Sequence, residues 1–199
     1  MPSEIRLRDP WASFLDDLDT QLTQPTEIHC LGGFVVSELY GLERPTADVD
    51  VFEATKGTDA ATLARFAGKG SELHKRHKVY LDIVTVATVP EHYESRLLDL
   101  FPDRFRNLRL KAFERHDLVL AKLERNIDRD REDLRRLADG PGLDVDVLRE
   151  RYTTELRPWL GRPDREDLTL QLWVEIIQEV QTRRYPDSTG LILEDRNKR

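Results

Sequence analysis

Two stretches with strand character, separated by a stretch with helical character, most constrain how this chain can fold. Residues 79–89 (VYLDIVTVATV) are rich in β-branched side chains, and residues 48–54 (DVDVFEA) alternate as a half-buried strand does. Between them, residues 58–70 (TDAATLARFAGKG) have the composition of a capped helix with a glycine-rich exit. Strands that alternate with helices along a chain favour a mixed α/β architecture.

The rest of the chain extends this pattern and then changes character. Upstream and downstream of the two strands we expect helices at 10–22, 34–42 and 94–101 and strands at 27–31 and 107–113. From His116 onward the sequence predicts helical stretches only, at 116–139, 145–160 and 165–185. The fold class is therefore α/β (α+β), with a mixed β-sheet of about four to five strands flanked by helices. We expect an α/β core at 1–115 and a helical C-terminal subdomain at 116–199 packed on it.

Composition narrows the classes of protein to which the chain can belong. Its 199 residues suffice for one sizeable core, and its single cysteine, Cys30, excludes an intramolecular disulfide and a multi-cysteine zinc site. The N-terminus lacks the apolar segment of a signal peptide, and no apolar run approaches the length of a membrane span. We therefore expect a cytoplasmic protein without membrane contact. The net charge of −7 argues against a surface-wide nucleic-acid coat.

The tetrapeptide DVDV occurs twice, at 48–51 and at 144–147, and its surroundings separate the two copies. The second copy follows a glycine-proline break at the head of a helical pattern, where acidic residues cap free N–H groups. The first copy lies in a predicted strand, so Asp48 and Asp50 point to the same side and the valines point into the core. Only the first copy is predicted to carry chemistry.

Two carboxylates on one strand face repel each other unless a cation lies between them. Oxygen ligands at this spacing suit Mg²⁺, which proteins hold with one or two carboxylates together with substrate phosphates. Asp82 lies in the next predicted strand and joins the pair if that strand lies beside residues 48–54. Carboxylates that hold two metal ions would match the in-line arrangement of phosphoryl transfer.

A glycine pair, Gly32-Gly33, stands where the strand at 27–31 passes into a helix. Glycines there let a phosphate approach the backbone, and a helix N-terminus favours negative charge. The alternative is a tight strand-to-helix turn without a ligand. The phosphate interpretation places a nucleotide-binding turn close in sequence to the aspartate pair.

Together these residues resemble the nucleotidyltransferase superfamily related to DNA polymerase β. A glycine pair opening a helix, then hDhDh on a strand, then a single acid on a later strand is the superfamily's pattern, here LGGFVVSELYGLERPTADVDVF followed by YLDIV. The lead-in also resembles the R-x-T-x-D-x-D form, through Arg44 and Thr46. The resemblance implies the nucleotidyltransferase fold, with Asp48 and Asp50 as metal ligands and Asp82 as third ligand or base.

A later segment, LVLAKLERNIDRDREDLRRLA, resembles the K…RDxxD segment of small bacterial nucleotidyltransferase-like proteins, including AbiEii-type toxins. The matching positions are Lys122, Arg129, Asp130 and Asp133. Lys122 either reaches a phosphate or extends its charge to the surface from an apolar helix. Arg129, Asp130 and Asp133 either belong to the active site or form a surface ion-pair cluster. The five histidines show no ligand spacing and are interpreted as structural or surface residues.

The expected function is Mg²⁺-dependent transfer of a nucleoside monophosphate from an NTP to a hydroxyl acceptor. Gly32, Gly33, Arg44, Thr46, Lys122, Arg129 and Asp130 would bind the nucleotide. The AbiEii resemblance implies a toxin that acts on tRNA or protein and is paired with a cognate antitoxin. The alternatives are an antibiotic-modifying enzyme of the aminoglycoside type and a catalytically silent module that binds a nucleotide or a partner.

Overall fold

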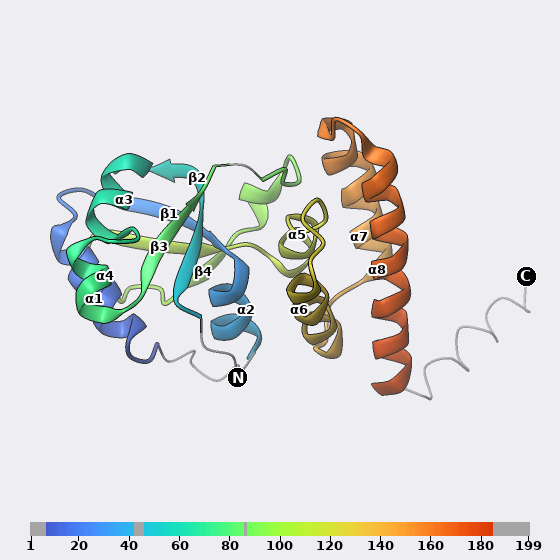
Figure 1. The fold of residues 1–199 in the computed structure, drawn as a ribbon, viewed down its shortest axis with the longest axis horizontal. Coiled ribbons are helices and arrows are strands. Elements are labelled where there is room, and N and C mark those ends of the chain that lie inside the picture. The colour runs from blue at the N-terminus through green and yellow to red at the C-terminus, as the bar shows by residue number, and fades with distance from the viewer. Residues whose placement is uncertain (1–6, 42–45, 86, 185–199) are drawn as a thin grey trace, which may run out of the picture.

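The computed structural model describes residues 7–41, 46–85 and 87–184. The molecule is elongated, with a β-sheet and its helices toward one end and a layer of helices at the other (Figure 1). The strands are β1 (Thr26–Leu31), β2 (Asp48–Lys56), β3 (Tyr80–Val84), β4 (Leu98–Leu100) and β5 (Leu108–Ala112). The helices around them are α1 (Trp11–Gln21), α2 (Gly32–Tyr40), α3 (Ala60–Ala67), α4 (Glu72–His77) and the short 3₁₀ helix η1 (Tyr93–Arg96). The helical layer comprises α5 (Arg115–Leu120), α6 (Asp128–Asp139), α7 (Val145–Arg151), the π-helix η2 (Tyr152–Leu156), the 3₁₀ helix η3 (Arg157–Trp159) and α8 (Pro163–Arg184).

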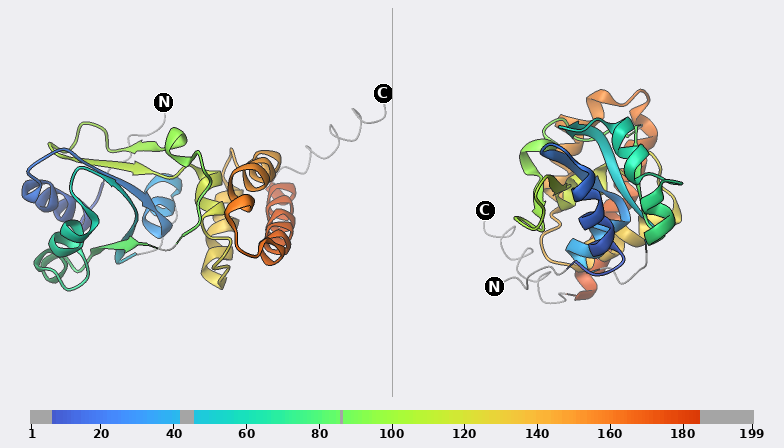
Figure 2. Two further views of the ribbon diagram at one scale, coloured as in Figure 1. Left: turned by 90° about the horizontal axis from the view of Figure 1, so that it is seen from above. Right: turned by 90° about the vertical axis from the view of Figure 1, so that its left-hand side faces the viewer.

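The five strands form one mixed sheet in the order β3-β2-β1-β5-β4. β2 runs parallel to β3 and antiparallel to β1, whereas β5 runs parallel to β1 and antiparallel to β4. The α/β class, the mixed sheet of four to five strands and the helical C-terminal part are thus confirmed. In Figure 1 and in the left view of Figure 2, α1, α3 and α4 gather at the end of the molecule away from α5–α8.

The alternation of β2 decides which face of the sheet joins the core. Val49 and Val51 have no exposed surface, and neither do Ile28 and Cys30 on the neighbouring β1. Each such side chain contributes about 1.5–3 kcal/mol when it is fully buried. Asp48 and Asp50 alternate with these valines and therefore lie on the opposite face of the strand. The apolar residues of β2 hold the strand in place, and its acidic residues remain available for chemistry.

Several local expectations differ from the structure. The strand expected at 79–89 ends at Val84 as β3, and the helix expected at 145–160 is divided into α7, η2 and η3. Residues 94–101 were expected to be helical, but the chain forms η1 and then the edge strand β4, because Leu100 packs into the core when paired with β5. Helix α4 was not expected, since Leu73 is its only buried residue; Ser71 caps it by accepting from the His74 N–H at 3.1 Å. The predicted continuous helix at 116–139 is interrupted between α5 and α6.

The second DVDV copy caps a helix, as expected. The Asp144 carboxylate accepts hydrogen bonds from the backbone N–H groups of Asp146 at 2.7 Å and Val147 at 3.2 Å, at the start of α7. Such a cap stabilises a helix by about 1 kcal/mol. No metal chemistry is needed to account for these aspartates.

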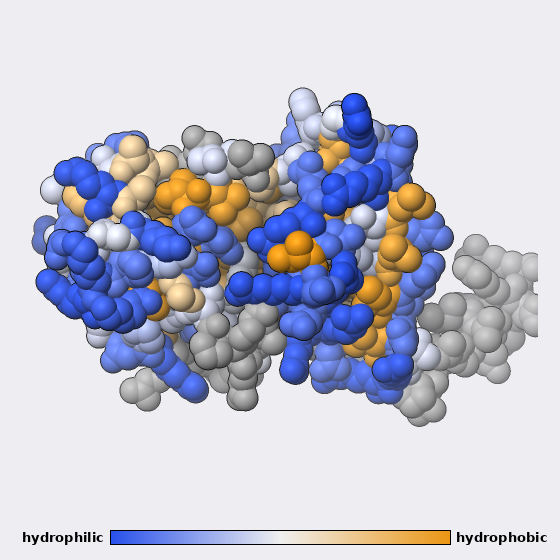
Figure 3. Space-filling model, in the orientation of Figure 1, coloured by the Kyte–Doolittle hydropathy of each residue, from blue (hydrophilic) through white to orange (hydrophobic). Residues whose placement is uncertain are grey.

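The last helix, α8, carries apolar side chains on its outer surface. Figure 3 shows an orange stripe along this helix, and Leu168 and Leu172 are exposed there. Within the described ranges, the helices are all too short or too polar to cross a membrane.

Candidate active site

Three carboxylates meet on the polar face of the sheet. β2 and β3 run parallel in a register that pairs Asp50 with Asp82, and Asp48 stands two residues before Asp50 on the same face. One carboxylate oxygen of each residue lies within 4.8 Å of one from each of the other two. We call Asp48, Asp50 and Asp82 the acidic cluster. The strand pairing on which the role of Asp82 depended is therefore present.

The environment of the acidic cluster disfavours three uncompensated negative charges. Burial first, and then the charges of Asp48 and Asp82, raise the pKa of Asp50 to about 6, while Lys122 and Arg125 act in the opposite direction. A bound cation would relieve the repulsion that raises this pKa. Carboxylate oxygens are the donors that hard divalent cations such as Mg²⁺ take. The donor set and its electrostatics therefore fit a divalent metal ion.

Position 32 must be a glycine because the acidic cluster lies close to the start of α2. It has a φ of +75°, and a β-carbon added there would lie 1.6 Å from Oδ2 of Asp50. Only glycine allows the Asp50 carboxylate to lie against this turn. Gly33 follows as the second residue of α2. The glycine pair was interpreted as a phosphate-binding turn, and its first member also makes room for a carboxylate of the site.

Replacing Gly32 tests this close approach. In Gly32→Ala the new methyl group must displace Asp50, and the residue keeps an unfavourable positive φ, so we expect a loss of about 2–3 kcal/mol in unfolding free energy. Gly41→Ala is a matched control, because Gly41 has a φ of +73° but no atom within 4 Å of the added β-carbon. The control should lose only about 1 kcal/mol. Urea denaturation measures both, and equal losses would contradict the contact with Asp50.

The residues before β2 were expected to bind nucleotide. Thr46 donates a hydrogen bond from Oγ1 to Oδ1 of Asp48 at 2.7 Å, so its hydroxyl holds a member of the acidic cluster in position. Arg44 lies outside the described residues.

The K…RDxxD segment contributes two ion pairs close to the acidic cluster. Lys122 Nζ binds Asp133 Oδ2 at 2.6 Å, and their side chains are 7% and 3% exposed. Asp130 is fully buried and accepts from Arg125 Nε at 3.0 Å and Nη2 at 2.5 Å, and also from the Ile127 N–H at 3.2 Å. Arg129 is exposed on α6. Asp130 therefore fixes the start of α6, and Arg125 is a cation at this site that the sequence analysis did not single out.

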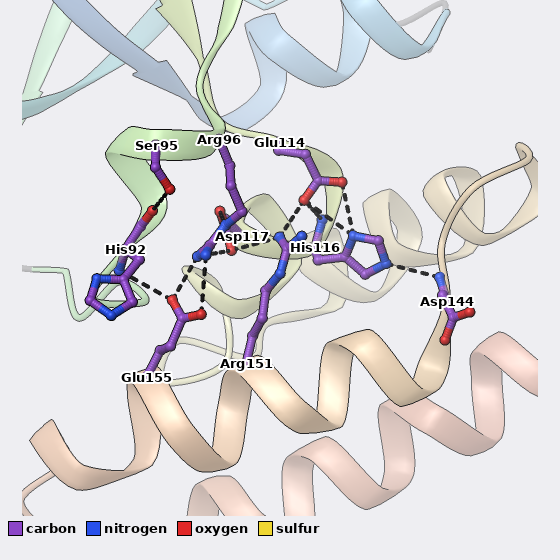
Figure 4. A network of polar contacts seen from close by, with 9 residues as sticks. All are labelled: His92, Ser95, Arg96, Glu114, His116, Asp117, Asp144, Arg151 and Glu155. Carbon is purple, nitrogen blue, oxygen red and sulfur yellow. Dashed lines mark hydrogen bonds and ion pairs between the residues drawn. The ribbon is translucent and has the colours of Figure 1, made fainter.

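A network of polar contacts holds α5 between the sheet domain and the later helices (Figure 4). The buried Asp117 accepts from Arg96 Nε at 2.8 Å and Arg151 Nη1 at 3.0 Å. Arg96 also binds Glu155, with its Nη2 lying 2.7 Å from Oε2. Because Lys122 follows directly after α5, these contacts also determine where Lys122 lies.

His116 and Glu114 extend the same network. His116 Nδ1 lies 2.8 Å from Glu114 Oε1, and its Nε2 accepts from the Asp144 N–H at 2.9 Å. Burial opposes the charge of Glu114, but hydrogen bonds and charges from His116 and Arg151 outweigh it and lower the pKa of Glu114 to about 2. His116 is buried in this network, which agrees with the structural role expected for the histidines.

The arrangement of groups fits the binding of a cation together with a phosphate. A carboxylate cluster suited to a cation adjoins a glycine turn at a helix start, with a lysine and an arginine nearby. No curated protein and no solved structure gives a significant match to the chain. Residues 14–181 match a protein family described as nucleotidyltransferase of unknown function (DUF6036). Because this match spans most of the sequence, the chain belongs to the DUF6036 family of nucleotidyltransferases.

Proposed function

We propose that this protein is a Mg²⁺-dependent enzyme that moves a nucleoside monophosphate from an NTP to an acceptor hydroxyl. A bond forms between the acceptor oxygen and the α-phosphorus, and the bond from the α-phosphorus to the leaving oxygen breaks. Pyrophosphate departs with that electron pair. The observation that carries the proposal is the acidic cluster, in which three carboxylate oxygens lie within 4.8 Å of one another beside the start of α2.

Each member of the acidic cluster has a distinct role in this proposal. Asp48 and Asp50, both half-buried on β2, would hold the metal, and Thr46 fixes the orientation of Asp48. Asp82 is the exposed member, so it is the carboxylate that an acceptor hydroxyl reaches most readily and the one that would take its proton. When bound, Mg²⁺ supplies positive charge that stabilises the phosphate oxygens.

We propose tRNA or protein as the acceptor, in a toxin whose partner is a cognate antitoxin. The support is the resemblance of the Lys122–Asp133 segment to AbiEii-type toxins. An acceptor of the aminoglycoside type is the second candidate, because a net charge of −7 suits a cationic small molecule.

Pyrophosphate release tests the reaction directly. The assay combines each of the four NTPs with Mg²⁺ and one of three acceptors: total tRNA, a protein lysate depleted of nucleic acid, or an aminoglycoside mixture. We expect release by the wild type and a loss of about 100-fold or more in Asp48→Asn/Asp50→Asn, since charge stabilisation in the transition state contributes several kcal/mol.

The second DVDV copy provides the matched control. Asp144→Asn/Asp146→Asn changes the same residue types, and asparagine caps a helix about as well as aspartate does. This variant should release pyrophosphate at the wild-type rate. Equal rates in both double variants would overturn the assignment of the acidic cluster. Mg²⁺-dependent nucleotide binding without pyrophosphate release on any acceptor would favour the catalytically silent module.

A further inference from the structure

The interruption between α5 and α6 brings a second cation to the acidic cluster. Asn126 adopts a φ of +43°, so the chain leaves the helical path that the sequence pattern predicts for residues 116–139. Lys122 and Arg125 lie in the turn just before this residue. A continuous helix would have placed these two side chains almost one turn apart along a single axis. Their positions are instead fixed by separate ion pairs to α6.

One edge of the Arg125 guanidinium binds Asp130, and the other edge is available for a ligand. In the described part of the chain its hydrogen bonds all go to Asp130, through Nε and Nη2. The Asp130 side chain is 0% exposed, while that of Arg125 is 57% exposed. A guanidinium can form a fork of parallel hydrogen bonds along its Nη1–Nη2 edge as well as along its Nε–Nη2 edge. The edge formed by Nη1 and Nη2 therefore remains for an anion.

Lys122 differs from Arg125 in its surroundings. Its ammonium lies 2.6 Å from Asp133 Oδ2, and only 7% of its side chain is exposed. Moving that ammonium to a ligand would break a buried ion pair with Asp133, which is costly. Arg125 can bind an anion without giving up Asp130. Of the two cations, Arg125 is the one arranged to contact a substrate.

Arg125 lies near enough to the acidic cluster for its charge to act on Asp50. α6, which holds Arg125 through Asp130, packs against α2, whose first residue touches the Asp50 carboxylate. The charges of Arg125 and Asp50 also interact: Asp50 adds to the rise in the pKa of Arg125 that the hydrogen bond to Asp130 chiefly causes. A group bound between the cluster and the start of α2 would therefore lie within the electrostatic reach of this guanidinium.

We propose that Arg125 binds the phosphate chain of the nucleotide through its Nη1–Nη2 edge, with Asp130 holding the guanidinium in place. The ligand class is an oligophosphate bound together with Mg²⁺. This inference rests on the proposed function and deepens it, because it names a phosphate-binding residue of the same site. Asp130 is then a positioning residue, and Lys122 is a buried charge paired with Asp133.

Binding of inorganic tripolyphosphate with Mg²⁺ tests the proposal without requiring the base or the acceptor to be known. Isothermal titration calorimetry of the full chain should give a dissociation constant that rises about 10-fold or more in Arg125→Ala, since a charge-assisted fork is lost. Arg125→Lys should recover only part of the affinity, because lysine cannot form the fork.

Arg157→Ala is the matched control. Arg157 forms the same Nε and Nη2 pair with Asp167, at 2.8 Å for each contact, and its side chain is 43% exposed, but it lies in η3. Its replacement should leave tripolyphosphate binding unchanged. In Arg125→Ala the buried Asp130 carboxylate loses its arginine partner, which could damage the fold. The double variant Arg125→Ala/Asp130→Asn removes that charge as well, so it separates loss of phosphate binding from damage to the fold.

The outcomes separate this inference from the proposed function. Wild-type affinity in Arg125→Ala, or no binding of tripolyphosphate by the wild type, would overturn the role of Arg125. Recovery of full affinity in Arg125→Ala/Asp130→Asn would also overturn it, because the defect would then come from the unpaired Asp130. Binding that depends on Arg125 without pyrophosphate release on any acceptor would support the phosphate site and count against the reaction.

Discussion

Asp50→Asn is expected to abolish pyrophosphate release and, in the metal-free protein, to raise the free energy of unfolding. Burial first, and then repulsion from Asp48 and Asp82, raise the pKa of Asp50 to about 6, and both penalise only the charged carboxylate. Removing that charge should stabilise the fold by about 1–2 kcal/mol at pH 7. The residue that we propose as a metal ligand is thus a source of instability.

The pH dependence of this gain follows from the direction of the shift. The pKa of Asp50 is higher in the folded protein than its ordinary value of 3.8, so the folded state binds more protons between the two values. Stability from this group is fully present below pH 4 and is lost as the pH rises through about 6. The advantage of Asp50→Asn should therefore be absent at pH 4 and complete above about pH 6.

Urea denaturation at pH 4 and pH 7, with a chelator present, measures this difference. Asp146→Asn serves as the control, because the Asp146 side chain is 93% exposed and its replacement should change stability little at either pH. If Asp50→Asn is no more stable than the wild type at pH 7, the acidic cluster does not carry the repulsion described above. Addition of Mg²⁺ should stabilise the wild type and so reduce the difference in unfolding free energy between it and Asp50→Asn.

Asp117→Ala is expected to cause the largest loss of stability, about 3–5 kcal/mol. The Asp117 side chain is 1% exposed and accepts hydrogen bonds from Arg96 and Arg151, whose side chains are 20% and 17% exposed. Asp117→Ala removes a buried partner from both arginines at once and leaves only the Arg96–Glu155 and Arg151–Glu114 pairs, in a setting poor in water. The loss should appear as a lower urea midpoint with an unchanged denaturant slope.

An exposed ion pair provides the contrast. Glu179→Ala removes the partner of Arg183 on α8, where the two side chains are 60% and 77% exposed, and it should cost no more than about 0.5 kcal/mol. A loss below 1 kcal/mol in Asp117→Ala would mean that the network in Figure 4 does not hold α5 to its neighbours.

The acidic face of the sheet could be predicted because side chains alternate between the two faces within each strand. The sequence of a strand therefore tells which of its residues share a face. In β2 the valines must face the core, and this places Asp48 and Asp50 on the other side whatever the partner strand is. The alignment of Asp82 with Asp50 depends on which strand pairs with β2 and on whether the two strands run parallel or antiparallel. The sequence pattern of a single strand contains neither piece of information. From the sequence, the contribution of Asp82 could therefore be predicted only on the condition that its strand pairs with β2.

The cation side of the site could not be predicted from periodicity. The apolar pattern of residues 116–139 continues across the turn at Asn126, so it favours one unbroken helix. The turn depends on Asp130, which accepts from both Arg125 and the Ile127 N–H, and the apolar pattern contains no sign of these polar contacts. Arg125 was missed for this reason. The edge strand β4 was missed because a three-residue strand shows too little alternation.

The contact between Gly32 and Asp50 also bears on how this site can change during evolution. Any side chain at position 32 would need the space that the Asp50 carboxylate occupies, with 1.6 Å between Oδ2 and an added β-carbon. The two positions are therefore coupled: a descendant that replaces the glycine must give up or move the carboxylate in the same lineage. A related sequence that keeps the aspartate but has a bulky residue at the glycine position would have to have rebuilt this turn. The pair can thus be used to separate relatives that keep this arrangement from relatives that have lost it.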